Sequence, residues 1–166
     1  MQLYLVRHGI AIDREDPKCP AEAERYLTEE GIKKTRDVAR SVAALVEKPS
    51  VLLSSPYVRA MQTAHLFAAA LKYPKQKIRK TNLLLPGADV AALFRELAKD
   101  KNLESAFCFG HAPHLDEVIA AVLGCKRDAT GLKKAGVACF DLRRFTPPAG
   151  SLVWLATPKL LKKIGR

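Results

Sequence analysis

The side chains best suited to chemistry are two histidines and two arginines, each just after a short apolar segment or within a turn of its end: Arg7, His8, Arg59 and His111. Arginine presents a planar fork of donors that matches phosphate oxygens, so two arginines can clamp one phosphoryl group. A neutral imidazole can attack phosphorus and form a covalent phosphohistidine that water later hydrolyses. A second imidazole, if protonated, would stabilise the charge that the equatorial oxygens gain in the transition state. The four side chains therefore predict phosphoryl chemistry, provided that they meet.

Two neighbouring features favour the same interpretation. Gly9 directly follows His8, and a residue without a Cβ atom lets the backbone approach closely and orient the imidazole. Arg59 falls in the first turn of an expected helix, where the N-terminal end of the helix dipole also attracts anions.

Short apolar segments alternate along the chain with stretches of helical periodicity. This alternation predicts an α/β fold, a three-layer α/β/α sandwich around a mostly parallel sheet. There is no repeat or linker, so we expect one domain over residues 1–166. The expected strands are 2–6, 50–54, 77–84, 104–109, 137–142 and 151–156, with a loop at 13–25. The expected helices begin at the Thr28 cap, at Ser55-Pro56, at Asp89 and after Pro113.

The apolar face of the first helix is expected to include Val38, Val42 and Leu45. Ligands of open α/β sheets bind beyond the carboxyl ends of the strands. Three strand ends carry the chemical side chains, because the first leads into Arg7-His8, the second into Ser55-Pro56 and Arg59, and the fourth into Gly110-His111. We therefore expect one crevice to hold them all.

Four ordered motifs resemble the signature of the histidine phosphatase superfamily, the clan that includes cofactor-dependent phosphoglycerate mutases. They are LVRHG at 5–9, Leu27-Thr28 with Gly31, the SSPYVRAMQT segment at 54–63, and GHAP at 110–113. Within the superfamily, the short chain, the LLP stretch at 84–86 and the ending at 154–158 are similar to SixA-type phosphohistidine phosphatases.

This resemblance implies a phosphoglycerate mutase-like fold and assigns roles to particular residues. It implies His8 as the nucleophile, with Arg7, Arg59 and His111 completing the catalytic pocket. Arg7, Gly9, Arg59 and His111 would bind the substrate phosphate. It implies neither a metal nor another cofactor.

One departure from the family pattern concerns the proton donor. Many members carry a carboxylate shortly before the LxP region, where this chain has Asn82-Leu83-Leu84. An alkoxide is a poor leaving group that needs a proton donor, whereas the P–N bond of a phosphoramidate is labile and its imidazole takes a proton from solvent. The pocket is therefore expected to suit phosphohistidine or aryl phosphates better than alkyl phosphates. Four loop carboxylates remain open as substitutes: Asp13, Glu15, Asp16 and Asp89.

Other polar residues near these motifs have simpler interpretations. His114 could form a metal set with His111, but the sequence offers no third ligand. His65 is expected to be structural. Gln62 and Thr63 either orient Arg59 or are ordinary helix residues, and both alternatives stay open.

The charge balance is unusual. Among 166 residues, 28 are Lys or Arg and 17 are Asp or Glu, which gives a net charge of +11 and a pI of about 9.7. Such a chain is expected to meet an anion: a phosphate ester, an acidic protein or nucleic acid. Nucleic acid is disfavoured, because aromatic residues are only 7% and no stacking motif is present. The basic ending with Lys159, Lys162, Lys163 and Arg166 is interpreted as a solvated face.

The remaining composition excludes further classes. No apolar run approaches the ~20 residues that span a bilayer, so no membrane association is expected. The first residues show neither the basic nor the apolar region of a signal peptide, so secretion is not expected. The four cysteines form no CxxC pair, so we expect a cytoplasmic monomer with free thiols.

Three functions are consistent with the sequence. The first is a metal-independent phosphatase that acts through a phosphohistidine on His8, preferably on protein phosphohistidine. The second is a phosphatase for small phosphate esters that uses a loop carboxylate as acid. The third is a non-catalytic module that binds phosphate.

Overall fold

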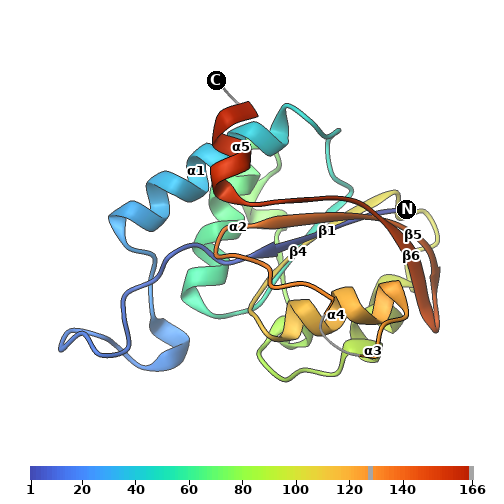
Figure 1. Ribbon diagram of the computed structural model, residues 1–166, viewed down its shortest axis with the longest axis horizontal. Helices are drawn as coiled ribbons and strands as arrows, with labels where there is room; N and C mark the ends of the chain where they lie inside the picture. Colours follow the sequence, from blue (N-terminus) through green and yellow to red (C-terminus); the bar gives the residue numbers. More distant parts are fainter. Residues whose placement is uncertain (127–128, 165–166) are drawn as a thin grey trace.

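One six-stranded sheet runs through the middle of the molecule. The computed structural model describes residues 1–126 and 129–164, with strands in the order β3-β2-β4-β1-β5-β6 (Figure 1). The first four strands are parallel, β5 is antiparallel to β1, and β6 is antiparallel to β5. This confirms the expected α/β class and mostly parallel sheet. The strands are β1 (Gln2–Arg7), β2 (Val51–Ser54), β3 (Arg79–Lys80), β4 (Ser105–Gly110), β5 (Val137–Phe145) and β6 (Pro148–Ala156).

Helices cover both faces of this sheet and make the three layers (Figure 1). Because side chains alternate along a strand, Leu3 and Leu5 of β1 pack into one core while Tyr4 and Val6 pack into the other. The first core lies under α3 (Val90–Leu97) and α4 (His114–Leu123). The second lies under α1 (Glu29–Ala43), α2 (Val58–Ala70) and α5 (Pro158–Ile164). Short 3-10 turns occupy Glu22–Glu24, Lys75–Lys77 and Asn82–Leu84.

Side-chain caps fix two helix starts where the sequence predicts them. The Thr28 hydroxyl accepts a hydrogen bond from the Gly31 amide at 3.0 Å at the start of α1. The Asp89 carboxylate accepts one from the Ala91 amide at 2.8 Å at the start of α3.

The start of α2 differs from the prediction. Ser55 does not cap a helix that begins with Pro56, since α2 begins at Val58 with Tyr57 as its N-cap. The Ser55 hydroxyl instead accepts a hydrogen bond from the Tyr57 amide at 3.3 Å and, as described below, contacts a histidine. Residues 55–57 thus form a turn at the carboxyl end of β2 instead of the first turn of α2.

Other predicted boundaries also change. The expected strand at 77–84 is reduced to the two residues of β3, because 3-10 turns stand on both sides of it. Leu45 does not join the apolar face of α1, since the helix ends at Ala43 and the Leu45 side chain is 52% exposed. The loop at 13–25 includes a 3-10 turn at Glu22–Glu24.

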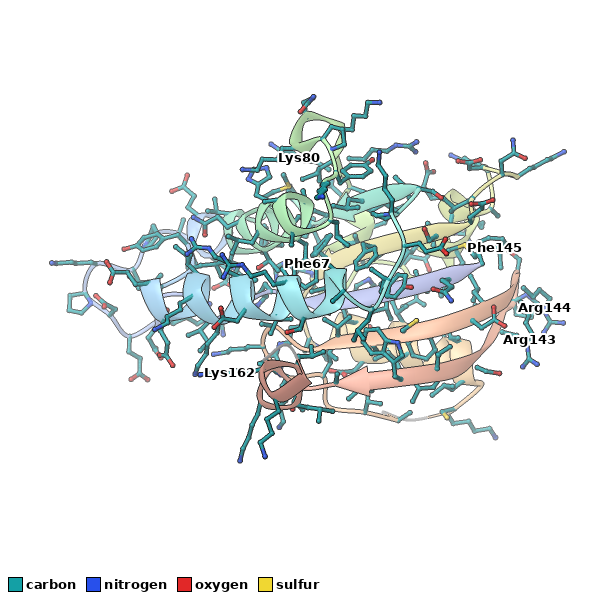
Figure 2. All side chains as sticks on the ribbon, turned by 90° about the horizontal axis from the view of Figure 1, so that it is seen from above. Phe67, Lys80, Arg143, Arg144, Phe145 and Lys162 are labelled. Atoms are coloured by element: carbon teal, nitrogen blue, oxygen red, sulfur yellow. The ribbon has the colours of Figure 1, made fainter. Side chains whose placement is uncertain are left out.

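The basic ending, expected as a solvated face, includes the helix α5, which buries Leu161 against the core while Lys162 stays exposed (Figure 2). Arg166, the last basic residue of that prediction, lies outside the described residues. All four cysteines are free, as expected. Within residues 1–126 and 129–164, no helix is both long enough and apolar enough to cross a membrane.

Candidate functional site

Backbone hydrogen bonds bring three strand ends together at one edge of the sheet. Arg7 of β1 is in register with Gly110 of β4, and the His8 amide donates to the Gly110 carbonyl at 3.0 Å. The Ser55 amide donates to the Phe109 carbonyl of β4 at 2.9 Å. The segments that carry His8, Arg59 and His111 therefore meet where the parallel strands end, as the sequence predicts.

A cavity of about 570 Å³ opens at this edge. Its lining includes the predicted side chains of Arg7, His8, Arg59 and His111, but not Gly9, whose amide donates to the Thr63 hydroxyl instead.

The hydrogen bonds of His8 fix its tautomer. Its Nδ1 lies 2.7 Å from the Gly9 carbonyl oxygen, which can only accept, so Nδ1 carries the proton. Its Nε2 then holds a lone pair, and the Nε–H of Arg59 donates to it at 3.3 Å. Burial, together with the charges of Arg59, Arg7 and Lys134, lowers the pKa of His8 to about 4, although the hydrogen bond to Gly9 acts in the opposite direction. His8 is therefore a neutral base near pH 7.

Arg59 is only 3% exposed and binds on three sides. Besides its contact with His8, it donates to the Glu22 carbonyl at 2.7 Å and to the Glu22 carboxylate at 2.8 Å. Its guanidinium also stands 5.0 Å from the centre of the Tyr57 ring. Burial lowers the pKa of Arg59, while Glu22 raises it, and the residue remains a cation.

Arg7 reaches the pocket from the end of β1. One of its terminal nitrogens donates to the Leu132 carbonyl at 2.7 Å. Its Nε is buried and has no partner among the described residues. Burial lowers the pKa of Arg7, and the nearby Asp116 carboxylate opposes that effect.

His111 stands beside His8, with 5.1 Å between the ring centres. Its Nε2 lies 2.8 Å from the Ser55 hydroxyl, which fixes the ring, while its buried Nδ1 has no partner in the described part of the chain. Burial, with smaller contributions from His8 and Arg59, lowers the pKa of His111 to about 3. With this pKa His111 is neutral near pH 7, rather than the protonated donor considered from the sequence.

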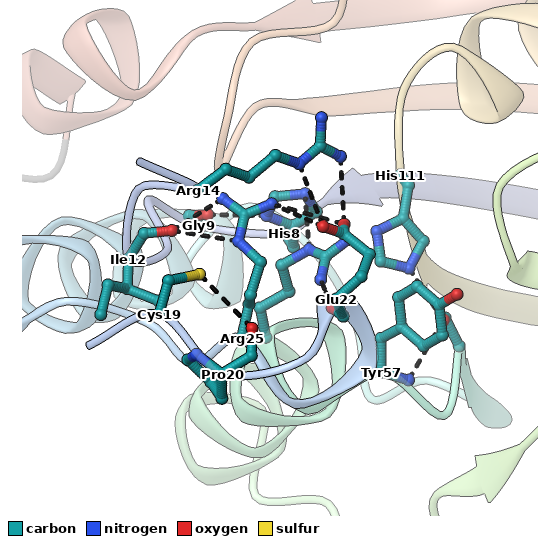
Figure 3. A network of polar contacts seen from close by, with 12 residues as sticks. His8, Gly9, Ile12, Arg14, Cys19, Pro20, Glu22, Arg25, Tyr57 and His111 are labelled. Carbon is teal, nitrogen blue, oxygen red and sulfur yellow. Dashed lines mark hydrogen bonds and ion pairs between the residues drawn. The ribbon is translucent and has the colours of Figure 1, made fainter. Parts of the chain in front are cut away.

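The carboxylate nearest to the site is Glu22, which the sequence analysis did not single out. Arg14, Arg25 and Arg59 surround it, at 3.0, 3.2 and 2.8 Å (Figure 3). The hydrogen bond from Arg14 is the main cause that lowers the pKa of Glu22 to about 2, with Arg25 and Arg59 adding to it. Glu22 is thus held ionised. The only signal in the sequence was its position between two arginines in a loop without periodicity.

The sequence left four loop carboxylates as alternative proton donors, and their positions in the structure divide them into two groups. Asp13 and Glu15 line the cavity, whereas Asp16 and Asp89 do not. Asp16 accepts a hydrogen bond from the Lys18 amide at 2.8 Å. Asp89 caps α3 and pairs with Arg95 at 2.9 Å. The latter two are structural.

Gln62 and Thr63 hold the loop after β1 instead of orienting the Arg59 side chain. The Gln62 side chain accepts from the Leu27 amide at 2.7 Å. The Thr63 hydroxyl accepts from the Gly9 amide at 3.1 Å and donates to the Arg59 carbonyl at 2.8 Å. α2 therefore positions the backbone beside His8.

The other histidines do not extend the site. His114 is fully buried and contacts the Leu83 carbonyl through Nε2 at 3.0 Å, while His65 is exposed on α2. Within the two described ranges, no group of three or more His, Cys, Asp or Glu side chains is arranged to hold a metal ion.

The sequence is similar to known proteins. The family model of the histidine phosphatase superfamily (branch 1) matches residues 3–83. An uncharacterized protein of Picosynechococcus is 38% identical over 143 residues, which cover 82% of each chain.

Solved structures share the fold at lower identity. The protein histidine phosphatase SixA, complexed with tungstate, superimposes with a TM-score of 0.84 and 22% identity over 96% of this chain and 98% of that one. A phosphoserine phosphatase variant of Entamoeba histolytica, bound to phosphoserine, superimposes with a TM-score of 0.73 and 16% identity over 96% of this chain and 98% of that one. A mycobacterial glucosyl-3-phosphoglycerate phosphatase superimposes with a TM-score of 0.73 and 18% identity over 94% of this chain and 99% of that one.

Proposed function

Because the chain belongs to the histidine phosphatase superfamily, we propose that it is a metal-independent phosphatase that acts through a covalent phosphohistidine on His8. The preferred substrate class is protein phosphohistidine. One observation carries the proposal: the lone pair on Nε2 of a neutral, buried imidazole lies beside the Arg59 guanidinium, which can hold a phosphoryl group.

The proposed reaction has two steps. In the first, Nε2 of His8 attacks phosphorus, the N–P bond forms, and the bond from phosphorus to the leaving group breaks. The Arg59 Nε–H gives up its contact with His8 and donates to a phosphoryl oxygen. In the second step water attacks phosphorus, a P–O bond forms, and the N–P bond breaks with its electron pair returning to Nε2. The attacking water loses one proton to solvent, and its oxygen leaves as part of inorganic phosphate.

Two unpartnered nitrogens support phosphate as the ligand. A buried polar atom without a hydrogen bond costs about 1–3 kcal/mol. The Arg7 Nε and the His111 Nδ1 are such atoms among the described residues, and both residues line the cavity. Phosphoryl oxygens would accept from both, and the charge of the phosphate would favour protonation of His111.

The ionised Glu22 supports the preference for a P–N bond. With a pKa of about 2 this carboxylate carries no proton to give to a leaving alkoxide. An imidazole leaving from phosphohistidine takes its proton from solvent instead. The SixA structure with tungstate supports the same substrate class, since SixA is a protein histidine phosphatase.

The second candidate is a phosphatase for small phosphate esters. Asp13 and Glu15 line the cavity and favour it, because either carboxylate could serve as the acid. Phosphoserine phosphatase and glucosyl-3-phosphoglycerate phosphatase have the same fold, and both names refer to small substrates.

The test compares the wild type with His8→Ala on a phosphohistidine protein, p-nitrophenyl phosphate and phosphoserine, with EDTA throughout. We expect turnover by the wild type in that order of rate, a loss of at least about 10³-fold in His8→Ala, and no loss in the control His65→Ala. The second candidate would be favoured if the wild type turned over phosphoserine as fast as the phosphohistidine protein and if Glu15→Gln lowered the rate on phosphoserine. Phosphate binding without any turnover would favour the non-catalytic module.

A further inference from the structure

A second and larger hollow adjoins the proposed catalytic pocket. It has a volume of about 880 Å³ and lies between α1, α5 and the segment before β5. Six lysines line it and define what we call the lysine groove: Lys33, Lys34, Lys133, Lys134, Lys159 and Lys162. The proposed reaction uses none of them.

The groove is strongly and openly cationic. All six lysine side chains are exposed, and Lys34 forms an ion pair with Glu30. The other five form no ion pair with a carboxylate of the described residues. Asp37 is the other acidic side chain of the lining. A concave surface with this excess of cations concentrates anionic partners.

The groove continues into the proposed catalytic pocket. Arg7 and Lys134 line both hollows. The Ala135 amide donates to the Arg7 and His8 carbonyls at 3.1 and 3.0 Å, and so ties the segment with Lys133 and Lys134 to the end of β1. A chain whose phosphorylated side chain enters the pocket would therefore find the groove directly beside it.

Resting on the proposed function, we propose that the lysine groove binds an acidic segment of a phosphorylated protein substrate, next to the phosphorylated side chain. The charge complementarity selects an acidic partner. The lysine stems, together with Ile10 and Pro158, give the lining an apolar floor on which a peptide can lie. The lining has no aromatic side chain on which the bases of a single-stranded nucleic acid could stack, so a peptide is the better occupant.

The test uses charge reversals on two helices of the groove, Lys33→Glu/Lys159→Glu/Lys162→Glu. The matched control is Lys48→Glu/Lys101→Glu/Arg143→Glu, which changes the net charge equally. Its residues are exposed and lie before β2, before β4 and near the far end of β5. Figure 2 shows Arg143 at the opposite end of the sheet from Lys162.

The first measurement is the dissociation constant of an unphosphorylated peptide flanked by glutamates, against the same peptide flanked by glutamines. We expect the wild type and the control variant to prefer the acidic peptide by about tenfold or more at low salt, and the groove variant to lose that preference. This readout does not depend on turnover. Equal binding of both peptides, or an equal loss in groove and control variants, would overturn the inference.

The second measurement is turnover of the corresponding phosphohistidine peptides and of p-nitrophenyl phosphate. The groove variant should raise KM for the acidic peptide about tenfold and change kcat/KM for p-nitrophenyl phosphate less than about twofold. The latter also shows that the variant folds. If it does not fold, the corresponding Lys→Gln variant takes its place.

The outcomes separate the two proposals. Acidic binding at the groove without any dephosphorylation would contradict the proposed function alone. Dephosphorylation of both peptides with equal KM would contradict the groove alone. A single-stranded oligonucleotide that binds the groove more tightly than the acidic peptide would also overturn the choice of occupant.

Discussion

The Nε–H of Arg59 donates a hydrogen bond to Nε2 of His8 at 3.3 Å, so a permanent cation faces the one ring nitrogen that holds a lone pair. The pairing is possible because Nδ1 on the other side of the ring keeps its proton and donates it in a hydrogen bond to the Gly9 carbonyl. A protonated imidazole could not accept from Arg59, and burial in a cationic pocket opposes protonation. The guanidinium that helps burial to keep His8 neutral is thus placed to bind the phosphoryl group that His8 would attack.

Replacement of Arg59 tests this double role. Arg59→Lys keeps a cation but removes the planar fork that contacts His8 and Glu22 together. We expect kcat/KM for p-nitrophenyl phosphate to fall by roughly 10²–10³-fold, the loss typical of one transition-state donor. The exposed Arg36 of α1 provides the control, since Arg36→Lys should leave the rate unchanged. A fall of less than about threefold in Arg59→Lys would show that the fork is not needed.

Glu22→Gln tests whether the Glu22 carboxylate is a proton donor or a group that competes with phosphate for the arginines around it. Because its pKa of about 2 keeps it ionised, we expect the variant to retain turnover of p-nitrophenyl phosphate. Loss of the negative charge beside Arg59 should make inorganic phosphate a several-fold stronger competitive inhibitor. The inhibition constant measures this, with Glu24→Gln on the exposed side of the same turn as control. A rate that falls at least tenfold on every substrate would identify Glu22 as the proton donor instead.

The loop after β1 packs so closely against α1 that Gly9 of the loop and Gly31 of α1 differ in what they tolerate. A Cβ atom at Gly31 would collide with the backbone carbonyl of Ile10, whereas one at Gly9 would meet the hydroxyl of the Thr35 side chain. Gly31→Ala should therefore destabilise more than Gly9→Ala, which should cost about 1–3 kcal/mol by overpacking. Gly131→Ala meets nothing within 4 Å and serves as the control. Urea unfolding measures the stability of the three variants, and equal stabilities of Gly9→Ala and Gly31→Ala would contradict the packing described.

Much of this arrangement could be predicted from the sequence. The apolar strands, the Thr28 and Asp89 caps and the order of the strand ends depend on local patterns, and these place His8 and His111 at one edge of the sheet. The family motifs lie in those local segments.

Features that depend on distant partners could not be predicted in this way. Glu22 reaches the site because arginines from α2 and from both sides of its own loop converge on it. The turn at Ser55 replaces a first helical turn because its hydroxyl contacts His111, which comes 56 residues later. The helix α5 has seven residues, too few for a clear period, and is recognised only when Leu161 packs on the core.

The pH dependence of the site follows from the lowered pKa of His8. Its folded-state pKa of about 4 lies below the ordinary value of 6.5, so the lone pair is lost only as the pH falls through about 4. After correction for ionisation of the substrate, kcat/KM should therefore stay flat from pH 8 to about pH 5 and fall below it.

Stability should respond to the same protonation. Between pH 6.5 and 4 the unfolded chain binds more protons at His8 than the folded chain does, so the free energy of unfolding decreases as the pH falls. NMR titration of the ring, assigned with His8→Gln, measures the pKa directly. A midpoint near 6.5 would show that the imidazole is not held neutral by its surroundings.

The most direct test of the account is to trap the covalent intermediate. The wild type is mixed with a phosphohistidine protein carrying a labelled phosphoryl group, denatured in base within the first turnover, and mapped by mass spectrometry. We expect a base-stable, acid-labile phosphoryl group on His8, absent in His8→Ala and present in the control His65→Ala. Steady turnover with no label on His8, or full activity of His8→Ala, would contradict it.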